Sequence, residues 1–348
     1  MITPAFAPTA TERVLPRLAL DFTTGVLDAR VTVTRALNTA TAVGSNGLIA
    51  IVNADLPRFD YDPATLAPKG LLIEEARTNL FLYSEDLADA TWGKNWGGGV
   101  SVTSNQANGP DGAQNLDLVT SSGLDGAAYQ PFATAFNAAH SVSFFVRQGT
   151  AASSRLEIFN AVSGPTASVT FSWTGGVPST SSTGGTPTNI KFENYGGGLY
   201  RVSFSFVSGG SGANLVLFAP DSTAGLGTSY AGYFQLEAGA FATSYIPTTT
   251  TSLTRNADVV SMTGTNFSSW YSTSAGSWCI QTNARNANVV LTSGLFTLTA
   301  NATALKKYAN TYSTDQSAIS LILGSGTVAK VSYYKQALTA AEVQAITA

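Results

Sequence analysis

Apolar and polar residues alternate with a period of two through the middle of this chain, which is the pattern of strands buried on one face. In LYRVSFSFV, for example, Val202, Phe204 and Phe206 share one face. Clusters of Gly, Pro and Ser separate such segments at spacings typical of β-sandwiches. The alternating segments are SVSFFVRQG (141–149), SRLEIFNAV (154–162), ASVTFSW (167–173), NIKFENYGGGLYRVSFSFVSG (189–209) and ANLVLFA (213–219). The pattern predicts a jelly-roll β-sandwich.

The composition agrees with an all-β fold and with more than one folded part. Apolar residues make up 44% of the 348 residues and charged residues only 11%, whereas disordered chains combine low hydrophobicity with high charge. A chain of this length is expected to divide into two or three domains. We expect an extended N-terminal anchor segment over residues 1–78, the jelly roll over residues 79–256 and a smaller C-terminal β-domain over residues 257–348.

Charge and hydropathy exclude two classes of partner. The net charge is −3, and the 18 Lys and Arg residues are scattered, so no basic stripe neutralises nucleic-acid phosphates. The sequence contains no run of 18 apolar residues, so no membrane-spanning helix is predicted. The N-terminus lacks the pattern of a signal peptide. One cysteine, Cys279, excludes an internal disulfide framework. We expect folding in a reducing cytoplasm.

The sequence offers little for catalysis. The single histidine, His140, begins a strand, and no HExxH, CxxC, P-loop or GxSxG motif is present. Glycosidases need only two carboxylates, but Glu157, Glu193 and Glu237 each stand alone in an apolar segment. We therefore expect no catalytic residue and no enzymatic activity.

One turn suggests a metal ligand. Asp111 lies in NGPDG (108–112), where an aspartate can contribute to a calcium site or can simply complete the turn. Apart from this candidate structural calcium, we expect no cofactor.

Aromatic residues outside the strand pattern suggest sugar binding, because the flat apolar faces of sugars stack on aromatic rings. Trp92 and Trp96 occur in the Gly-rich segment TWGKNWGGG, and Tyr129 is a third candidate for carbohydrate contact. The alternative for the two tryptophans is to close the open end of the sandwich. Trp173 continues the alternation of Val169 and Phe171 and is expected in the core.

Charge is concentrated in RFDYDPATLAPKGLLIEEARTNL (58–80), which holds seven charged residues, as many as the hundred residues 121–220. Without a nearby aromatic cleft or histidine, we interpret it as an assembly joint. Opposite charges would pair and set its path, and residues 71–73 would bury against the jelly roll or a neighbouring subunit. Deleting residues 1–78 would then leave a soluble jelly roll. The joint residues are Arg58, Asp60, Asp62, Glu74, Glu75 and Arg77.

Four segments carry a resemblance to a known class of protein. PRFDYDPATLAPKGLLIEEARTNLFLYSEDL (57–87) and LDFTTGVLDARVTVTRALNTATAVGSNGLIAIV (20–52) resemble segments that precede a carbohydrate-module-like jelly roll in tailed-bacteriophage virion proteins. YFQLEAGAFATSYIPTTTTSLTRNADVV (233–260) resembles the segment that closes it, and VSYYKQALTAAEVQAITA (331–348) resembles the end of laminin-G-like sandwiches in phage fibres and spikes. The third part is short for a laminin-G sandwich, and no long β-helical body is present.

The resemblance implies a structural component of the virion, assembled in the host cytoplasm: a tail fibre, a head fibre or spike, or a decoration protein. Such a protein would contact other virion proteins, self-associate as a homo-oligomer such as a trimer, and attach to a host-surface glycan. Two alternatives stay open. One is a capsid cement protein without a ligand, and the other is a polysaccharide depolymerase.

Overall fold

The computed structural model describes residues 15–37, 39–133, 135–209, 211–222, 225–271, 277–282, 287–291, 296–300, 305–310, 318–321 and 325–334. It is almost entirely β-structure in antiparallel sheets, so the predicted all-β sandwich is confirmed. The chain divides into two units rather than three consecutive parts. Unit 1 comprises Met1–Val33, Lys69–Ile73 and Val259–Ala348, and unit 2 comprises Thr34–Pro68 and Glu74–Asp258. The segment expected to be a separate anchor is thus shared between the two.

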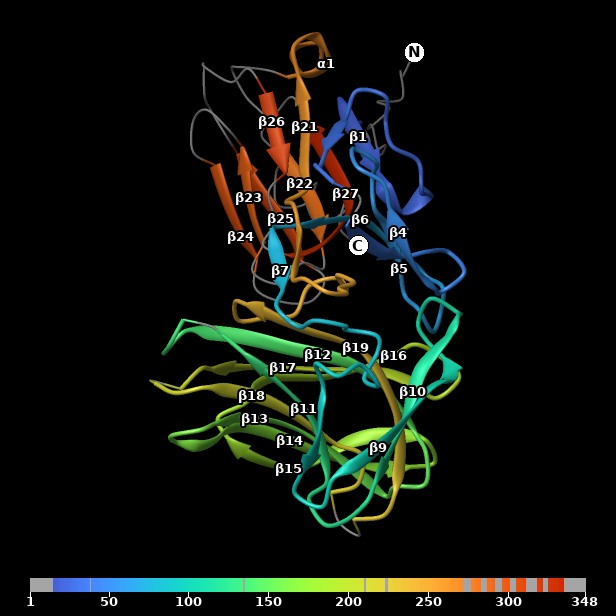
Figure 1. The fold of residues 1–348 in the computed structure, drawn as a ribbon. Coiled ribbons are helices and arrows are strands. Elements are labelled where there is room, and N and C mark those ends of the chain that lie inside the picture. The colour runs from blue at the N-terminus through green and yellow to red at the C-terminus, as the bar shows by residue number, and fades with distance from the viewer. Residues whose placement is uncertain are drawn as a thin grey trace, which may run out of the picture. The chain divides into compact units, whose positions relative to one another are not determined.

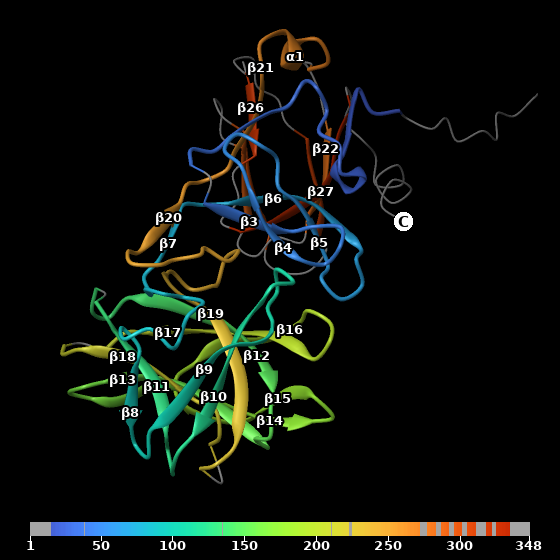
Figure 2. The ribbon, with the colours of Figure 1, turned by 45° about the vertical axis from the view of Figure 1, so that its right-hand side comes forward.

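Unit 2 is a jelly-roll-like sandwich of two six-stranded sheets (Figure 1). The β12 sheet contains, in spatial order, β16 (Thr188–Asn194), β17 (Leu199–Val207), β12 (Ala139–Gln148), β19 (Thr228–Ala238), β10 (Gln114–Ser121) and β9 (Val100–Asn108). The β13 sheet contains β15 (Val177–Gly185), β14 (Gly164–Thr174), β13 (Ser153–Asn160), β18 (Asn214–Ala219), β11 (Ala127–Phe132) and β8 (Gly93–Trp96). In Figure 2, β19, β10 and β9 run side by side along the sandwich.

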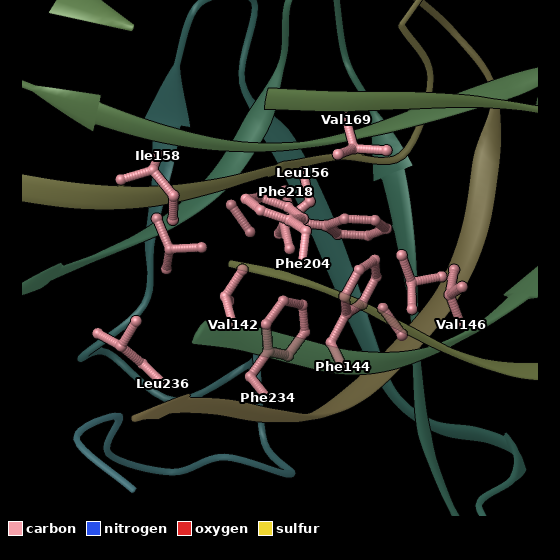
Figure 3. Packing of buried hydrophobic residues seen from close by; sticks show 14 of the residues in the cluster. Val142, Phe144, Val146, Leu156, Ile158, Val169, Phe204, Phe218, Phe234 and Leu236 are labelled. Carbon is pink, nitrogen blue, oxygen red and sulfur yellow. The ribbon is translucent and has the colours of Figure 1, made fainter. Parts of the chain in front are cut away.

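The core lies between these two sheets, where the alternating apolar residues of both meet (Figure 3). Phe144 of the β12 sheet stacks on Phe234 with ring centroids 5.0 Å apart, and it contacts Phe218 of the β13 sheet at 5.2 Å. Aromatic pairs in these geometries add to the free energy gained from buried area. The inward residues predicted from the period of two, such as Val169 and Phe171, are fully buried.

The outer face of the β12 sheet is covered by a hairpin of β3 (Ala40–Val43) and β4 (Ile49–Val52). Val43 and Ile49 of the hairpin pack in one cluster with Phe145, Leu199 and Tyr233 of the sheet. The same unit contains β5 (Phe59–Tyr61) and a pair formed by β7 (Arg77–Asn79) and β20 (Leu253–Arg255). Residues 34–68 therefore form part of the folded unit and contribute to its second hydrophobic cluster.

Unit 1 contains a sheet in the order β25 (Leu305–Asn310), β22 (Ser277–Thr282), β27 (Ser325–Tyr334) and β6 (Pro68–Glu74), with β1 (Leu18–Asp21) also pairing with β27. Its other elements are β2 (Thr32–Thr34), β21 (Val259–Thr263), β26 (Ala318–Leu321), the hairpin of β23 (Ala287–Leu291) and β24 (Phe296–Ala300), the 3-10 helix η1 (Phe22–Thr24) and the short helix α1 (Thr265–Ser268).

The aliphatic run 71–73 was expected to bury against the jelly roll or a neighbouring subunit, and this is wrong. Leu71, Leu72 and Ile73 are buried within β6, which belongs to unit 1 and lies beside β27 in its sheet. Gly70 permits this pairing, because a Cβ there would lie 2.2 Å from the Val328 carbonyl oxygen and its φ is +106°. Strand pairing with a distant segment, which the local pattern does not encode, decided where this run is buried.

Candidate functional site

Three aromatic side chains form a cluster on the outer face of the β13 sheet, and we call Trp96, Tyr129 and Phe159 the aromatic platform. The Trp96 ring lies 5.9 Å from that of Tyr129 and 5.0 Å from that of Phe159, both edge-on. All three rings are partly buried, on a floor formed by Ala127, Leu217 and Ala219. The floor and the platform come from the strands of this one sheet, so the platform is a surface feature of the sandwich.

Strand register places a charged group beside the platform. Glu157 lies opposite Leu217, which lies opposite Tyr129, so these three side chains share one row and one face. Arg155, two residues before Glu157 and on the same face, forms an ion pair with it, and the Arg155 Nε lies 3.1 Å from the Glu157 carboxylate. Its Nη2 lies 3.3 Å from the Asp125 carboxylate. One guanidinium therefore holds two carboxylates at the edge of the aromatic cluster.

Glu157 is held in an unusual environment for a surface carboxylate, since the residue is only 8% exposed. Burial raises the pKa of the Glu157 carboxyl above its ordinary value, the Arg155 charge opposes this, and the Asp125 charge adds to it. At neutral pH a carboxylate in this position accepts hydrogen bonds and donates none. The site thus combines flat apolar rings with an oriented acceptor.

The structure places the three residues predicted to contact a sugar in two different environments. Trp96 and Tyr129 lie together on the platform, and the Tyr129 hydroxyl donates to the Asn95 side chain at 3.0 Å. Trp92 is only 1% exposed and packs in the core against Phe234, with ring centroids 4.9 Å apart. The expectation that Trp92 contacts a glycan is therefore wrong, because its ring belongs to the hydrophobic core.

Phe159 was missed in the sequence, although a signal for it was present. In SRLEIFNAV, Leu156 and Ile158 alternate as the inward face, which leaves Arg155, Glu157 and Phe159 on the other face. An aromatic residue on the polar face of a strand was the indication. The local pattern did not show that Phe159 would meet Trp96, which lies 63 positions earlier in the chain.

Asp111 lies in the turn that joins β9 and β10. Its carboxylate accepts a hydrogen bond from the Ala113 N–H at 2.9 Å and another from the Asn115 side chain at 3.2 Å. Within the described ranges, no three His, Cys, Asp or Glu side chains gather as metal ligands. The local geometry is that of the turn-completing alternative, and the calcium assignment stays a prediction.

The six residues of the predicted assembly joint have three different environments. Asp60 accepts from the Val43 N–H, and Asp62 accepts from the Thr65 N–H, so both carboxylates stabilise backbone within unit 2. Glu75 and Arg77 pair with each other near the surface, and the Arg77 guanidinium lies over the Phe241 ring.

Arg58 and Glu74 are instead buried in a charge cluster of unit 2. Arg58 Nη1 lies 2.8 Å from a Glu74 carboxylate oxygen, and the same guanidinium pairs with Asp258. Arg35 contacts the other Asp258 oxygen at 2.7 Å, and Arg255 lies 3.1 Å from Glu74. Arg35, Arg58, Glu74, Arg255 and Asp258 thus pair within unit 2, and the role of this stretch in assembly stays a prediction.

Burial and neighbouring charges have opposite effects on the pKa values of Glu74 and Arg58 in this buried charge cluster. Burial alone would raise the pKa of Glu74, but the charges of Arg255 and Arg58 and hydrogen bonds from Ser244 outweigh it and hold this pKa below its ordinary range. Burial lowers the pKa of Arg58, but the charges of Glu74 and Asp258 more than reverse this. The fold therefore stabilises the ionised forms of Glu74 and Arg58, whereas burial lowers the pKa of Arg255.

The carboxylates considered for catalysis come from three different strands of two sheets. Glu157 is on the outer face of the β13 sheet, whereas Glu193 and Glu237 belong to strands of the β12 sheet. Glu237 is buried and accepts from the Thr243 N–H at 2.9 Å. His140 is buried and stacks on Phe206 with ring centroids 5.7 Å apart. None of these groups meets another across a cleft.

Comparison with models of known protein families finds none that matches the chain, and comparison with curated proteins finds no significant match. Among the described residues, no helix has the length and apolar character needed to cross a membrane.

Proposed function

We propose that this chain is a structural surface component of a tailed-bacteriophage virion, a fibre or spike protein that binds a host-surface glycan through the aromatic platform and carries out no catalysis. The observation that supports glycan binding best is the cluster of Trp96, Tyr129 and Phe159 on the outer face of the β13 sheet. Small-molecule sites are lined mostly by apolar and aromatic side chains with a few oriented polar groups, and the platform with Glu157 beside it has this composition.

The two outer faces of the sandwich differ in a way that favours the β13 sheet as the binding face. The outer face of the β12 sheet packs against residues of the β3–β4 hairpin. The apolar cluster on the outer face of the β13 sheet contains residues of β8, β11, β13 and β18 only. The aromatic side chains of that cluster therefore remain partly accessible to a ligand.

Binding without reaction is favoured over hydrolysis. A glycosidase places two carboxyl groups on either side of the bond to be cleaved. On the platform, Glu157 and Asp125 are both held by Arg155 at one edge, so they flank no position for a sugar ring. This arrangement supports an adhesive role rather than the depolymerase alternative.

The virion assignment and self-association rest on the sequence segments that resemble phage virion proteins. A homo-oligomer, such as a trimer, would present several identical platforms to one cell surface. Weak individual contacts then become effective through avidity.

Glycan binding is tested with Trp96→Ala and Tyr129→Ala in the full chain, each applied to a glycan array and to host cells. We expect both variants to lose binding while their unfolding transitions stay close to that of the original chain. Phe136→Ala is the matched control, because this phenylalanine is 50% exposed and does not belong to the platform cluster. Glycan binding that survives both platform substitutions would contradict the proposal.

The cement-protein alternative makes a different prediction for the same variants. If the chain only reinforces the particle, Trp96→Ala virions should adsorb to the host normally, and removal of the whole protein should reduce particle stability. A glycan-binding fibre instead predicts reduced adsorption by Trp96→Ala virions of unchanged stability.

A further inference from the structure

We propose that the aromatic platform selects neutral glycan chains and rejects anionic ones such as polyuronates and polysialate. This inference rests on the proposed function, which it deepens by assigning the chemical class of the ligand. It is carried by the pairing of Arg155 with two carboxylates at the platform edge and by the scarcity of other charge on the sheet.

The charge on this face favours neutral ligands. The six strands of the β13 sheet contain three charged residues, namely Lys94, Arg155 and Glu157. Lys94 donates from Nζ to the backbone carbonyls of Asp89 and Trp92 at 2.9 Å. Arg155 is shared between Glu157 and Asp125, so these three groups together carry a net negative charge. An incoming carboxylate would find no unoccupied guanidinium and would meet two carboxylates.

The rest of the face offers hydroxyl groups. β14 and β15 contain no charged residue, and their sequences, GPTASVTFSWT and VPSTSSTGG, are rich in Ser and Thr. Since Ala167, Val169 and Phe171 point into the core, Ser168, Thr170 and Ser172 fall on the outer face, where Ser168 is buried and Thr170 and Ser172 are partly exposed. Hydroxyls both donate and accept, which suits the hydroxyls of an uncharged sugar.

The strand register places a residue of β14 in the same row as a residue of the aromatic platform. Ser168 lies opposite Glu157, Glu157 opposite Leu217, and Leu217 opposite Tyr129. With neighbouring strands ~4.8 Å apart, this row from β14 to β11 spans roughly 14 Å. A sugar chain lying across the strands would stack on the platform at one end, pass over Glu157, and reach the partly exposed Thr170 and Ser172 hydroxyls of β14 at the other.

Glu157 then has a defined part in recognition. Its buried carboxylate is already oriented by Arg155 and can accept hydrogen bonds from sugar hydroxyls, and hydrogen bonds to an ionised acceptor are stronger than neutral ones. The same carboxylate repels a sugar acid, because like charges brought together across an interface disfavour binding. One residue thus strengthens neutral binding and excludes anionic ligands.

The test is calorimetric titration of the full chain with two probe sets at neutral pH. The neutral set consists of gluco-, manno- and galacto-oligosaccharides, and the anionic set consists of oligogalacturonate and oligosialate. We expect binding within the neutral set only. Glu157→Gln should weaken that binding about tenfold, the loss expected for a hydrogen bond to a charged acceptor. Glu193→Gln, which removes one negative charge from the β12 sheet, is the matched control and should change nothing.

The double variant Asp125→Asn with Glu157→Gln provides the opposite arm, because it frees Arg155 of both carboxylates. We expect it to gain affinity for the anionic set, and retained rejection of that set would overturn the electrostatic account of selectivity. Tighter binding of anionic than of neutral sugars by the original chain would overturn the inference and leave glycan binding intact. Binding of neither set, by the original chain or the variants, would overturn the proposed function itself.

Discussion

Arg58 and Asp258 lie 200 positions apart in the chain and form an ion pair in which neither side chain is more than 2% exposed. Three residues of the buried charge cluster lie close in sequence to the positions where the chain passes from one unit to the other. Glu74 begins one segment of unit 2, Asp258 ends it, and Arg35 is the second residue of the other. The buried charge cluster therefore holds together, within unit 2, the chain segments that lead to and from unit 1.

Glu74→Gln should destabilise unit 2 strongly. The substitution leaves Arg255 without its carboxylate partner and Arg58 with Asp258 alone, and removing one partner of a buried ion pair costs about 3–5 kcal/mol. Chemical unfolding followed by a probe of the sandwich measures the change. Glu75→Gln is the control, because the Glu75 side chain is 46% exposed and such surface pairs contribute about 0–1 kcal/mol. Equal losses for the two variants would contradict the assignment.

A chain that begins at Asn79 should fail to fold as a stable sandwich, in contrast to the expectation from the sequence. The truncation removes Arg35, Arg58 and Glu74 and leaves Arg255 buried without its carboxylate. It also removes the hairpin that covers Phe145 on the β12 sheet. Soluble yield and size-exclusion chromatography measure the outcome, and a monomeric product with an unchanged melting temperature would refute this view.

The stability of unit 2 should fall in acid through Glu74. Its pKa is lowered in the folded state, so its contribution is present above the unfolded-state pKa of about 4.3 and is lost as pH falls below that value toward the folded-state pKa. Unfolding free energies of the original chain and of Glu74→Gln should therefore differ most near neutral pH and converge as pH is lowered. A constant difference down to about pH 2 would contradict the lowered pKa.

His140 should contribute a second pH dependence, in a higher range. Burial lowers its pKa, so the folded state stays neutral where the unfolded state takes up a proton. Stability is then complete above the unfolded-state pKa of about 6.5 and declines as pH falls below it. Because the chain has one histidine, His140→Gln should abolish this slope between about pH 7.5 and about pH 5.5. Identical slopes in the two proteins would refute the assignment.

Substitutions of Trp92 and Trp96 should have different effects, with the first reducing the stability of unit 2 and the second reducing glycan binding. Trp92→Ala removes a core side chain that packs on Phe81 and Phe234, and such truncations cost about 3–5 kcal/mol. Trp96→Ala removes a partly exposed ring and should cost less stability while abolishing glycan binding. Thermal unfolding and glycan titration of both variants measure the two effects, and a larger loss of stability for Trp96→Ala would contradict the placement of these residues.

The sequence identified two of the three platform residues, but it did not show the full set of residues that form the platform. Trp96 and Tyr129 were identified as aromatics outside the core pattern, and they do lie together. Trp92 was misassigned because a Gly-rich flank indicates a loop without showing which way its side chains point. Phe159 was overlooked because its partner, Trp96, lies in another strand of the sheet.

The sequence by itself determined the all-β sandwich, because a period of two imposes one apolar face on each strand whatever its neighbours are. It also marked the charged stretch 58–80 as a place where opposite charges pair. Only the tertiary structure decided that Arg58 and Glu74 pair with Asp258 and Arg255, that β6 is buried in unit 1, and that Phe159 completes the platform. These outcomes depend on contacts between residues tens to hundreds of positions apart, and periodicity within a segment carries no information about them.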